Sequence, residues 1–325
     1  MQKGSTNLEK RPFGNTDMHI TPVGYGSWAL GGGGWVYSWG PQDDSESIAA
    51  IHHAIDKGIN WIDTAAGYGL GHSEEVVGQA LKGMSERPFV FTKCSTPWNE
   101  RREIIPSLKR DSLRLECEAS LRRLQIDAID LYQIHWPRLE EELEEGWAAL
   151  AELQREGKVR WIGVSNYSVA QLKQAQAIAP VSSLQPPYSL IKPEVEQEIL
   201  PYCQKHNIGV IVYSPMYSGL LTGKMTAERI KNLPPDDWRQ RDPEFQMPRL
   251  EQNLELVATL AEIGKKHEVE PGVVAIAWTL RHPAVTAAIV GARRSSQVDG
   301  IFPAVSFRLS PQEIDQLDGF LSKKS

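Results

Sequence analysis

Four polar residues of the sequence have side chains suited to acid–base chemistry. They are Asp63, Tyr68, Lys93 and His135. Asp63, Lys93 and His135 each end a short apolar run that is typical of a buried strand, and Tyr68 lies in the loop of small residues after Asp63. Because the carboxyl ends of parallel strands open onto one mouth, we expect all four side chains to converge in one site.

These residue types favour the reduction of a carbonyl group. A buried lysine needs an anionic partner, which Asp63 could supply to Lys93. Lys93 beside the phenol should also lower the pKa of Tyr68 from about 10 and make it a general acid. His135 could donate a hydrogen bond to the carbonyl oxygen. The set lacks a good nucleophile for acyl transfer and the carboxylate cluster of metal or glycoside chemistry, so we expect no metal, and hydride must come from elsewhere.

Each residue taken alone also has a structural interpretation. Asp63 could cap a helix, Tyr68 could anchor a loop, and His135 could pack in a corner of the chain. Four such residues at three consecutive strand ends are difficult to explain as coincidence. Cys94, next to Lys93, is interpreted as a packed thiol rather than a reactive one.

Predicted strands alternate with predicted helices along most of the chain. The apolar runs that predict strands lie at residues 22–27, 59–63, 89–93, 129–135, 159–164, 183–185, 208–213 and 287–290. Eight strand–helix units in about 300 residues predict an α/β protein with a closed (β/α)8 barrel, the TIM barrel. The alternative is an open doubly wound sheet, which should carry GxGxxG between its first strand and a helix. Here the glycines after residue 23 lead into a long loop instead, which disfavours the open sheet.

We expect a single domain over residues 1–325, with additions at both ends of the barrel. Residues 1–9 should form a loose tail, and a turn at 14–17 predicts a hairpin over 11–20. One helix is predicted at 194–205, and extra helices near the C-terminus are predicted at 252–267, 271–282, after 295 and from 310. Residues 215–250 have no long periodic stretch, which is typical of a functional or mobile loop.

Composition excludes several classes of protein. The chain is 41% hydrophobic and 23% charged with a formal net charge of -6, and its Lys and Arg residues are scattered, which argues against nucleic acid as a partner. No apolar run approaches the roughly 20 residues of a membrane helix, and no apolar segment follows the N-terminus as in a secretion signal. Three widely spaced cysteines suit reduced thiols, so we expect a cytoplasmic protein with no membrane partner.

Taken together, the segments that carry these residues resemble the aldo-keto reductase superfamily. The matching motifs are residues 58–65 with Tyr68-Gly69, His72-Ser73-Glu74, Thr92-Lys93, residues 130–136, Gly163-Val164-Ser165-Asn166, Gln185, Tyr213-Ser214-Pro215 and Gly291-Ala292-Arg293. The resemblance extends from residue 24 to about residue 317. The long glycine- and tryptophan-bearing first loop is similar to the bacterial branch, which also contains proteins similar to potassium channel β subunits.

The resemblance implies an NADPH-dependent enzyme that reduces aldehydes and ketones to alcohols. It implies that Tyr68 donates the proton, that Lys93 and Asp63 tune it, and that His135 orients the carbonyl. The residues implied to bind NADPH or NADP+ are Ser27, Trp28, Ser165, Asn166, Gln185, Tyr213, Ser214, Pro215, Met216, Gly219, Leu220, Lys224, Gly291, Arg293, Arg294 and Gln297. Two adjacent arginines suit the 2′-phosphate of NADPH, because planar guanidinium groups pair bidentately with phosphate.

The substrate itself does not follow from the sequence. Trp35, Trp98 and Trp136 are expected to line the substrate pocket and to favour hydrophobic or aromatic aldehydes or the faces of sugars, although tryptophans in such loops could equally pack against each other. The chain departs from the family where Ile301 and Arg138 replace a frequent asparagine and a frequent acid. The alternative function is a nicotinamide-sensing regulatory partner protein that resembles channel β subunits. A homo-oligomer is compatible with either function.

Overall fold

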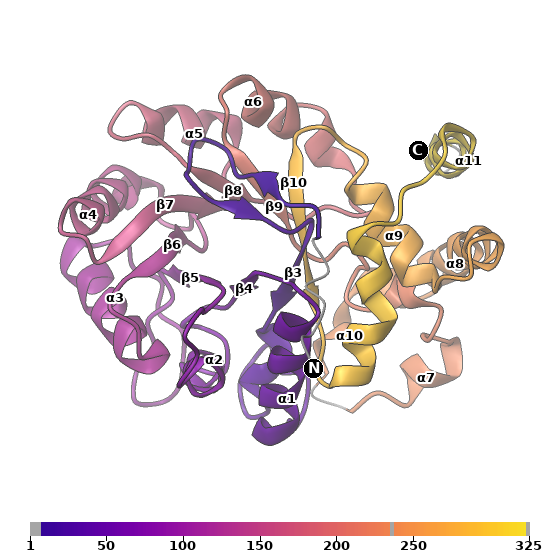
Figure 1. Ribbon diagram of the computed structural model, residues 1–325, viewed down its shortest axis with the longest axis horizontal. Helices are drawn as coiled ribbons and strands as arrows, with labels where there is room; N and C mark the ends of the chain where they lie inside the picture. The colour runs from indigo at the N-terminus through magenta and orange to yellow at the C-terminus, as the bar shows by residue number, and fades with distance from the viewer. Residues whose placement is uncertain (1–7, 235–236, 323–325) are drawn as a thin grey trace.

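Eight parallel strands close into a barrel at the centre of the molecule (Figure 1). The computed structural model describes residues 8–234 and 237–322. Its barrel strands are β3 (Val23–Gly26), β4 (Trp61–Asp63), β5 (Phe89–Cys94), β6 (Ile129–Ile134), β7 (Val159–Ser165), β8 (Ser183–Gln185), β9 (Gly209–Val212) and β10 (Val285–Gly291). Each strand pairs in parallel with the next, and β10 pairs with β3 to complete the circle. The predicted (β/α)8 barrel is therefore confirmed.

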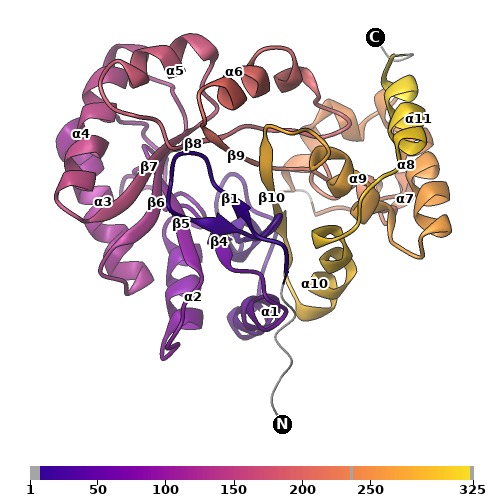
Figure 2. The same ribbon diagram turned by 45° about the horizontal axis from the view of Figure 1, so that its top comes forward.

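Helices surround the barrel and continue beyond its last strand. They are α1 (Asp44–Asp56), α2 (His72–Leu81), α3 (Arg110–Leu124), α4 (Leu143–Arg155), α5 (Val169–Gln176), α6 (Ile199–Lys205), α7 (Ala227–Lys231), α8 (Arg249–Lys266), α9 (Pro271–Thr279), α10 (Ser295–Ile301) and α11 (Pro311–Ser322). Both α8 and α9 lie between β9 and β10, while α10 and α11 follow β10. The extra helices predicted near the C-terminus are present and gather on one side of the barrel (Figures 1 and 2).

The predicted N-terminal hairpin is also present, and it covers the amino end of the barrel. Its strands are β1 (Arg11–Pro12) and β2 (His19–Ile20), which pair antiparallel and lie across the front of the barrel in Figure 1. The ring of Phe13 stacks on that of Phe91 at 5.7 Å, within a buried apolar cluster that also contains Trp61. The hairpin thus closes one end with apolar side chains and leaves the opposite end for the site. The tail predicted over residues 1–9 lies mostly outside the described residues.

Helix 194–205 is the element that the sequence prediction described incorrectly. Glu194–Glu196 is a short 3-10 turn, and α6 begins only at Ile199. Pro201 explains the break, because proline has no N–H and is tolerated only in the first turn of a helix, where the N–H groups have no intrahelical partner. Among its described residues, the irregular segment predicted over 215–250 holds only α7 and several 3-10 turns before α8 begins at Arg249.

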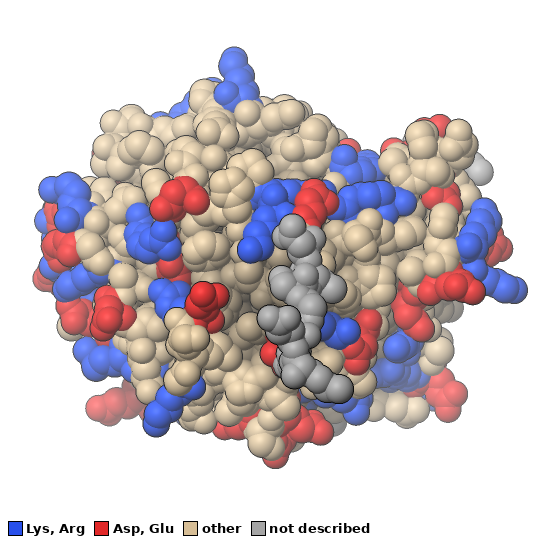
Figure 3. Space-filling view, in the orientation of Figure 1, with Lys and Arg blue, Asp and Glu red and all other residues tan. Residues whose placement is uncertain are grey.

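The surface that carries the hairpin is mixed in charge. Lys and Arg side chains are interspersed with Asp and Glu over this face (Figure 3). Within the described ranges, no helix has both the length and the apolar character that crossing a bilayer would require.

A buried glutamate on α3 holds the turn that follows β5, just beyond Lys93. The Glu116 carboxylate accepts hydrogen bonds from the backbone N–H groups of Ser95 at 3.3 Å and Thr96 at 3.1 Å. Ser95 has a left-handed backbone with φ of 72°. Burial raises the pKa of Glu116 to about 8, and the hydrogen bonds from Thr96 and Ser95, followed by the charge of Arg123, oppose that shift only in part. The turn at the end of β5 therefore depends on a carboxyl group that titrates near neutral pH.

We predict that replacing Gly24 with alanine destabilises the barrel. A Cβ atom at position 24 would lie 2.1 Å from the indole ring of Trp61, which is fully buried. Overpacking of this kind costs about 1–3 kcal/mol, measurable as a lower urea midpoint. Gly319→Ala in α11 is the control, since a Cβ there meets nothing within 4 Å, and it should raise stability by about 0.5–1 kcal/mol. Equal stability of Gly24→Ala and wild type would contradict the prediction.

We predict that Glu116 makes the protein less stable as pH rises. Its pKa of about 8 in the folded protein exceeds the 4.5 of an unperturbed glutamate, so folding favours the protonated form. The resulting stability is complete below pH 4.5 and is lost as pH rises toward and through 8. Glu116→Gln cannot titrate. The stability of wild type minus that of Glu116→Gln should therefore fall between pH 5 and pH 9 by an amount on the order of 4 kcal/mol. Parallel stability curves for the two proteins in urea would refute this.

Candidate active site

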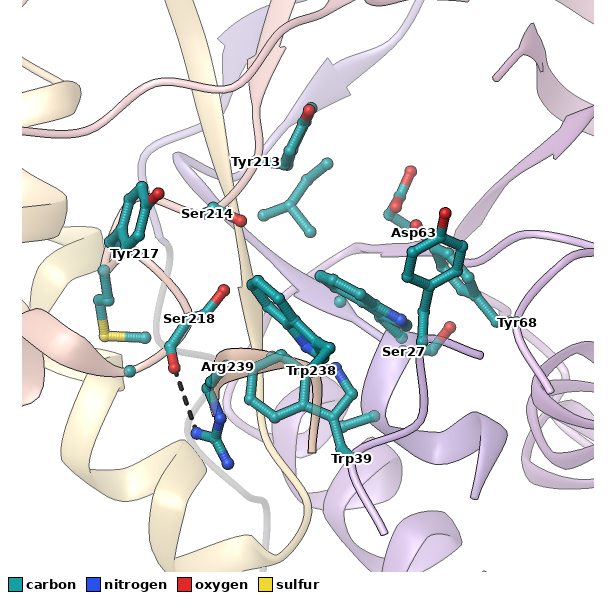
Figure 4. Close-up of a pocket in the computed structure, with 18 of the residues that line it drawn as sticks. Ser27, Trp39, Asp63, Tyr68, Tyr213, Ser214, Tyr217, Ser218, Trp238 and Arg239 are labelled. Atoms are coloured by element: carbon teal, nitrogen blue, oxygen red, sulfur yellow. Dashed lines mark hydrogen bonds between the residues drawn. The ribbon is translucent and has the colours of Figure 1, made fainter. Parts of the chain in front are cut away.

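A large cavity opens at the carboxyl ends of the barrel strands, opposite the hairpin. Its volume is about 1540 Å³. It extends from the ends of β4 and β6 to the start of α10, and part of it is drawn in Figure 4. Asp63, Tyr68 and His135 lie at one end of this cavity, with Lys93 buried against Asp63, and the residues expected near the adenosine lie at the other.

Asp63 and Lys93 form a buried ion pair beneath the cavity. The Lys93 Nζ atom donates to Asp63 Oδ1 at 2.6 Å and to the backbone oxygen of Thr64 at 3.0 Å. The second oxygen of Asp63 accepts from Gln185 Nε2 at 2.9 Å. Both charged side chains are almost fully buried, with Lys93 0% and Asp63 3% exposed. Burial raises the pKa of Asp63 and lowers that of Lys93, and the opposite charge of each partner resists both shifts.

Tyr68 lies directly above this pair. Lys93 Nζ donates to the Tyr68 hydroxyl at 3.3 Å, so one lysine connects the carboxylate with the phenol. The expectation that Lys93 lowers the pKa of Tyr68 is wrong for this structure. Burial, followed by the charge of Asp63, raises the Tyr68 pKa well above its usual range. The phenol is therefore protonated at neutral pH, which is the form that can donate a proton.

His135 faces Tyr68 from the end of β6. The two rings meet edge to face, with their centroids 5.7 Å apart. The His135 backbone oxygen accepts from Asn166 Nδ2 at 3.0 Å, which ties the loop after β6 to the end of β7. Burial and the charges of Lys93 and Arg138 lower the pKa of His135 well below its usual range. The imidazole is consequently neutral at neutral pH, and a neutral ring still carries one N–H that can donate to an oxygen.

The ends of β7, β8 and β9 carry a connected polar network next to Tyr68. Ser165 Oγ donates to the backbone oxygen of Gln185 at 2.8 Å, and Asn166 Nδ2 donates to Ser165 Oγ at 3.0 Å. The hydroxyl of Tyr213 donates to Asn166 Oδ1 at 2.9 Å. Asn166 has a left-handed backbone with φ of 63°, a conformation that asparagine tolerates better than most residues. Amide groups and an aromatic ring thus line one wall of the cavity.

The chain after β9 turns sharply along the cavity. Four of its residues, Ser214, Tyr217, Ser218 and Gly219, have positive φ angles between 44° and 90°. Ser214, Pro215, Met216, Gly219 and Lys224 all line the cavity, as expected from the sequence. Leu220 does not, because its side chain is fully buried in a separate apolar cluster. A contact between the Leu220 side chain and a ligand in this cavity is therefore excluded by the fold.

The two adjacent arginines at the far end of the cavity differ in their surroundings. The Arg293 guanidinium donates to Gln42 Oε1 at 2.5 Å and to the backbone oxygens of Trp39 and Pro41. Arg294 is exposed, and its guanidinium forms no hydrogen bond or ion pair with the residues that the structure describes. The side chain of Gln297 accepts from the Arg293 backbone N–H at 2.7 Å. Arg294 is thus the freer of the two cations.

An aromatic cluster that the sequence reasoning missed spans the cavity between two loops. Trp28 stacks on Trp238 at 5.8 Å and meets Trp39 edge to face at 5.4 Å. Arg239 lies over the Trp39 ring at 4.6 Å and donates to the backbone oxygen of Ser218 (Figure 4). The only sequence signal for this cluster is a tryptophan within the stretch 234–241, which otherwise consists of prolines and polar or charged residues.

The three indole rings of this cluster share an unusual feature. Each Nε1 atom is buried, and none has a hydrogen-bond acceptor among the described residues. The same holds for Nδ1 of His135. A buried donor without an acceptor costs about 1–3 kcal/mol, so ligand oxygen atoms that accept from these indole N–H groups would remove that cost.

Of the three tryptophans expected in the substrate pocket, the structure places two on the cavity wall. Trp35 and Trp136 line the cavity, with Trp35 tilted against Tyr68 at 6.5 Å. Trp98 does not line it. The Trp98 ring lies beneath the guanidinium of Arg123 at 5.6 Å, and Trp98 forms a short β-bridge to Ile104. The loop after β5 therefore turns this side chain toward α3.

The other residues expected at the cofactor all line the cavity. They are Ser27, Trp28, Ser165, Asn166, Gln185, Tyr213, Gly291, Arg293, Arg294 and Gln297.

Known proteins share both this sequence pattern and this fold. The Aldo/keto reductase family matches residues 22–322. The aldo-keto reductase YhdN of Bacillus subtilis is 36% identical over 317 residues, which cover 97% of this chain and 94% of YhdN. The NADH-specific methylglyoxal reductase of Escherichia coli is 34% identical over 317 residues, covering 93% of this chain and 95% of that enzyme.

A solved structure agrees with these matches. The glycerol dehydrogenase AKR11B4 of Gluconobacter oxydans superposes with a TM-score of 0.88 at 36% identity, over 99% of this chain and 96% of that one. Aldo-keto reductases are oxidoreductases that use a nicotinamide cofactor. With its barrel, its polar mouth and these relatives, the chain belongs to the aldo/keto reductase family.

Proposed function

We propose that this protein reduces aldehydes and ketones to alcohols with NADPH, and that Tyr68 donates the proton. The observation that carries the proposal is the position of the Tyr68 hydroxyl, 3.3 Å from the Nζ atom of Lys93 and next to the ring of His135. A carbonyl oxygen in front of these two rings would meet two hydrogen-bond donors. Both are aimed at the atom on which negative charge develops during reduction.

The division of labour follows from the charge state of each group. The pKa of Tyr68 is raised, so the phenol holds its proton until the carbonyl oxygen becomes basic. The Lys93 ammonium, held by Asp63, then stabilises the phenolate that remains. The pKa of His135 is lowered, so the ring stays neutral and orients the carbonyl by hydrogen bonding rather than by protonating it. A bound nicotinamide supplies the hydride.

The polar network at the ends of β7 to β9 supports a nicotinamide site beside Tyr68. Ser165, Asn166 and Gln185 offer hydroxyl and amide groups that match a carboxamide, and Tyr213 presents a ring on which the nicotinamide could stack. Gln185 also donates to Asp63 at 2.9 Å. We infer that Gln185 links the cofactor site to the ion pair that supports the proton donor.

The rest of the cavity suits the ribose and phosphate groups of the dinucleotide. The buried indole N–H groups of Trp28, Trp39 and Trp238 have no acceptor among the described residues, and a phosphate or ribose oxygen would satisfy them. Arg294, which is free of partners in the described chain, is proposed to pair with the 2′-phosphate. A relative that covers nearly the whole chain is named NADH-specific, so membership of the family does not determine which coenzyme is preferred. The proposed preference for NADPH therefore rests on Arg294.

We predict that Tyr68→Phe abolishes turnover and leaves NADPH binding nearly intact. The variant removes only the hydroxyl, so the loss should exceed about 100-fold, as is usual for a general acid. The measurement is the loss of NADPH absorbance with an aromatic aldehyde, together with a fluorescence titration of NADPH. Turnover retained in the variant would rule out Tyr68 as proton donor. Tight NADPH binding without turnover by the wild type would favour a nicotinamide-sensing regulator instead.

We predict that Arg294→Gln weakens NADPH binding about tenfold, the effect of losing one charge-assisted contact with phosphate. NADH lacks the 2′-phosphate and is the matched control, so its dissociation constant should hardly change. Arg293→Gln should weaken both coenzymes, because Arg293 also holds the segment 39–42 at the cavity edge. An equal loss of NADH and NADPH affinity in Arg294→Gln would exclude the proposed role.

A further inference from the structure

The substrate end of the cavity has a local charge opposite to that of the whole chain. In the loops after β5, β6 and β8, three cations line the cavity, namely Arg102, Arg138 and Lys192, with one exposed carboxylate, Glu103. None of the three cations forms an ion pair within the described residues, and Glu103 accepts a hydrogen bond from Asn99 at 2.8 Å. A protein with a formal net charge of -6 thus presents a positive surface where its substrate must enter.

Arg138 is the best placed of these cations. Its guanidinium carbon lies 5.2 Å from the centre of the Trp136 ring, and Trp136 in turn stacks on His135 at 6.0 Å. The charge of Arg138 is close enough to help lower the pKa of His135. A guanidinium that packs on an indole still has its N–H edge available for a bidentate contact. Arg138 is therefore held by a ring next to His135, and its guanidinium donates no hydrogen bond to any residue that the structure describes.

We propose that the physiological substrate carries an anionic group in addition to its carbonyl, and that Arg138 binds this group. The inference rests on the proposed reductase function. The anionic group is a carboxylate or a phosphate, and its oxygen atoms should lie about one ring length from the carbonyl. The atoms that connect the two groups would then pack on the ring of Trp136. Arg102 and Lys192 also attract the anionic group of the substrate, but within the described residues neither packs on an aromatic ring as Arg138 does on Trp136.

Two aldehydes of matched shape test the proposal. The anionic probe is 4-carboxybenzaldehyde and the neutral probe is methyl 4-formylbenzoate, each assayed with saturating NADPH at low ionic strength. The wild type should show a kcat/KM about tenfold higher for the anionic probe, since one charge-assisted contact is worth roughly a factor of ten. Salt should reduce this preference because it screens exposed charges. The compound 4-formylphenyl phosphate then distinguishes phosphate from carboxylate as the better anion.

Substitutions identify the cation responsible. In Arg138→Gln, the preference for the anionic probe should disappear through a higher KM, with kcat and the neutral aldehyde almost unchanged. Arg138→Lys should keep most of the preference, because the charge remains. Arg155→Gln is the control, since Arg155 is an exposed arginine at the end of α4 and does not line the cavity. An equal loss with both aldehydes in Arg138→Gln, or a wild type that prefers the neutral probe, would overturn the proposal.

A binding measurement separates this proposal from the reductase function. Calorimetric titration with 4-(hydroxymethyl)benzoate should give about tenfold weaker binding to Arg138→Gln than to wild type, whether or not any aldehyde is reduced. If the wild type reduces neither aldehyde but binds 4-(hydroxymethyl)benzoate more tightly than Arg138→Gln does, the reductase function is rejected and the anion site is retained. If the wild type reduces the neutral aldehyde but both proteins bind 4-(hydroxymethyl)benzoate equally, the anion site is rejected and the reductase function is retained.

Discussion

The buried ion pair of Asp63 and Lys93 is the constraint on which the rest of the site depends. Two charges with almost no solvent contact are tolerable only if every lone pair and proton has a partner. The backbone oxygen of Thr64, the amide of Gln185 and the hydroxyl of Tyr68 supply those partners. The hydrogen bond that Lys93 donates therefore positions the Tyr68 hydroxyl. The hydrogen bond that Asp63 accepts positions the Gln185 side chain next to Ser165. The same contacts that make the pair stable arrange the candidate proton donor and the candidate nicotinamide wall.

The barrel makes this arrangement possible because its apolar packing lies at the amino end and its polar residues lie at the carboxyl end. The hairpin and the apolar residues around Phe91 fill the amino end, so the carboxyl end can keep polar groups and space. Loops from distant parts of the chain then close over that space, as the contact between Trp28 and Trp238 shows. Among the described residues, the indole N–H groups of Trp28, Trp39 and Trp238 have no acceptor and Arg294 has no ionic partner, which indicates that these loops are arranged for a ligand rather than for maximal stability.

Sequence reasoning succeeded where the signal is local and periodic. Apolar runs that end in polar residues predicted the strands, and their order predicted that Asp63, Tyr68, Lys93 and His135 would meet. It failed for properties that depend on the direction in which a side chain points or on its surroundings. The pKa of Tyr68 rises because the phenol is buried and lies near the charge of Asp63, and burial is not visible in a sequence. Trp98 and Leu220 lie in motif-bearing loops, yet both point away from the cavity. Trp238 was overlooked because its segment has no periodicity.

The sequence by itself therefore determined the barrel, the family and the identity of the polar residues at the strand ends. Those properties depend on the alternation of apolar and polar residues and on short motifs, which are encoded over a few neighbouring positions. Only the tertiary structure decided which arginine remains free, which tryptophans face the cavity and which groups are protonated. Each of these depends on contacts between residues far apart in the chain, such as Arg293 with Gln42 or Asp63 with Gln185, and such contacts exist only once the loops have packed.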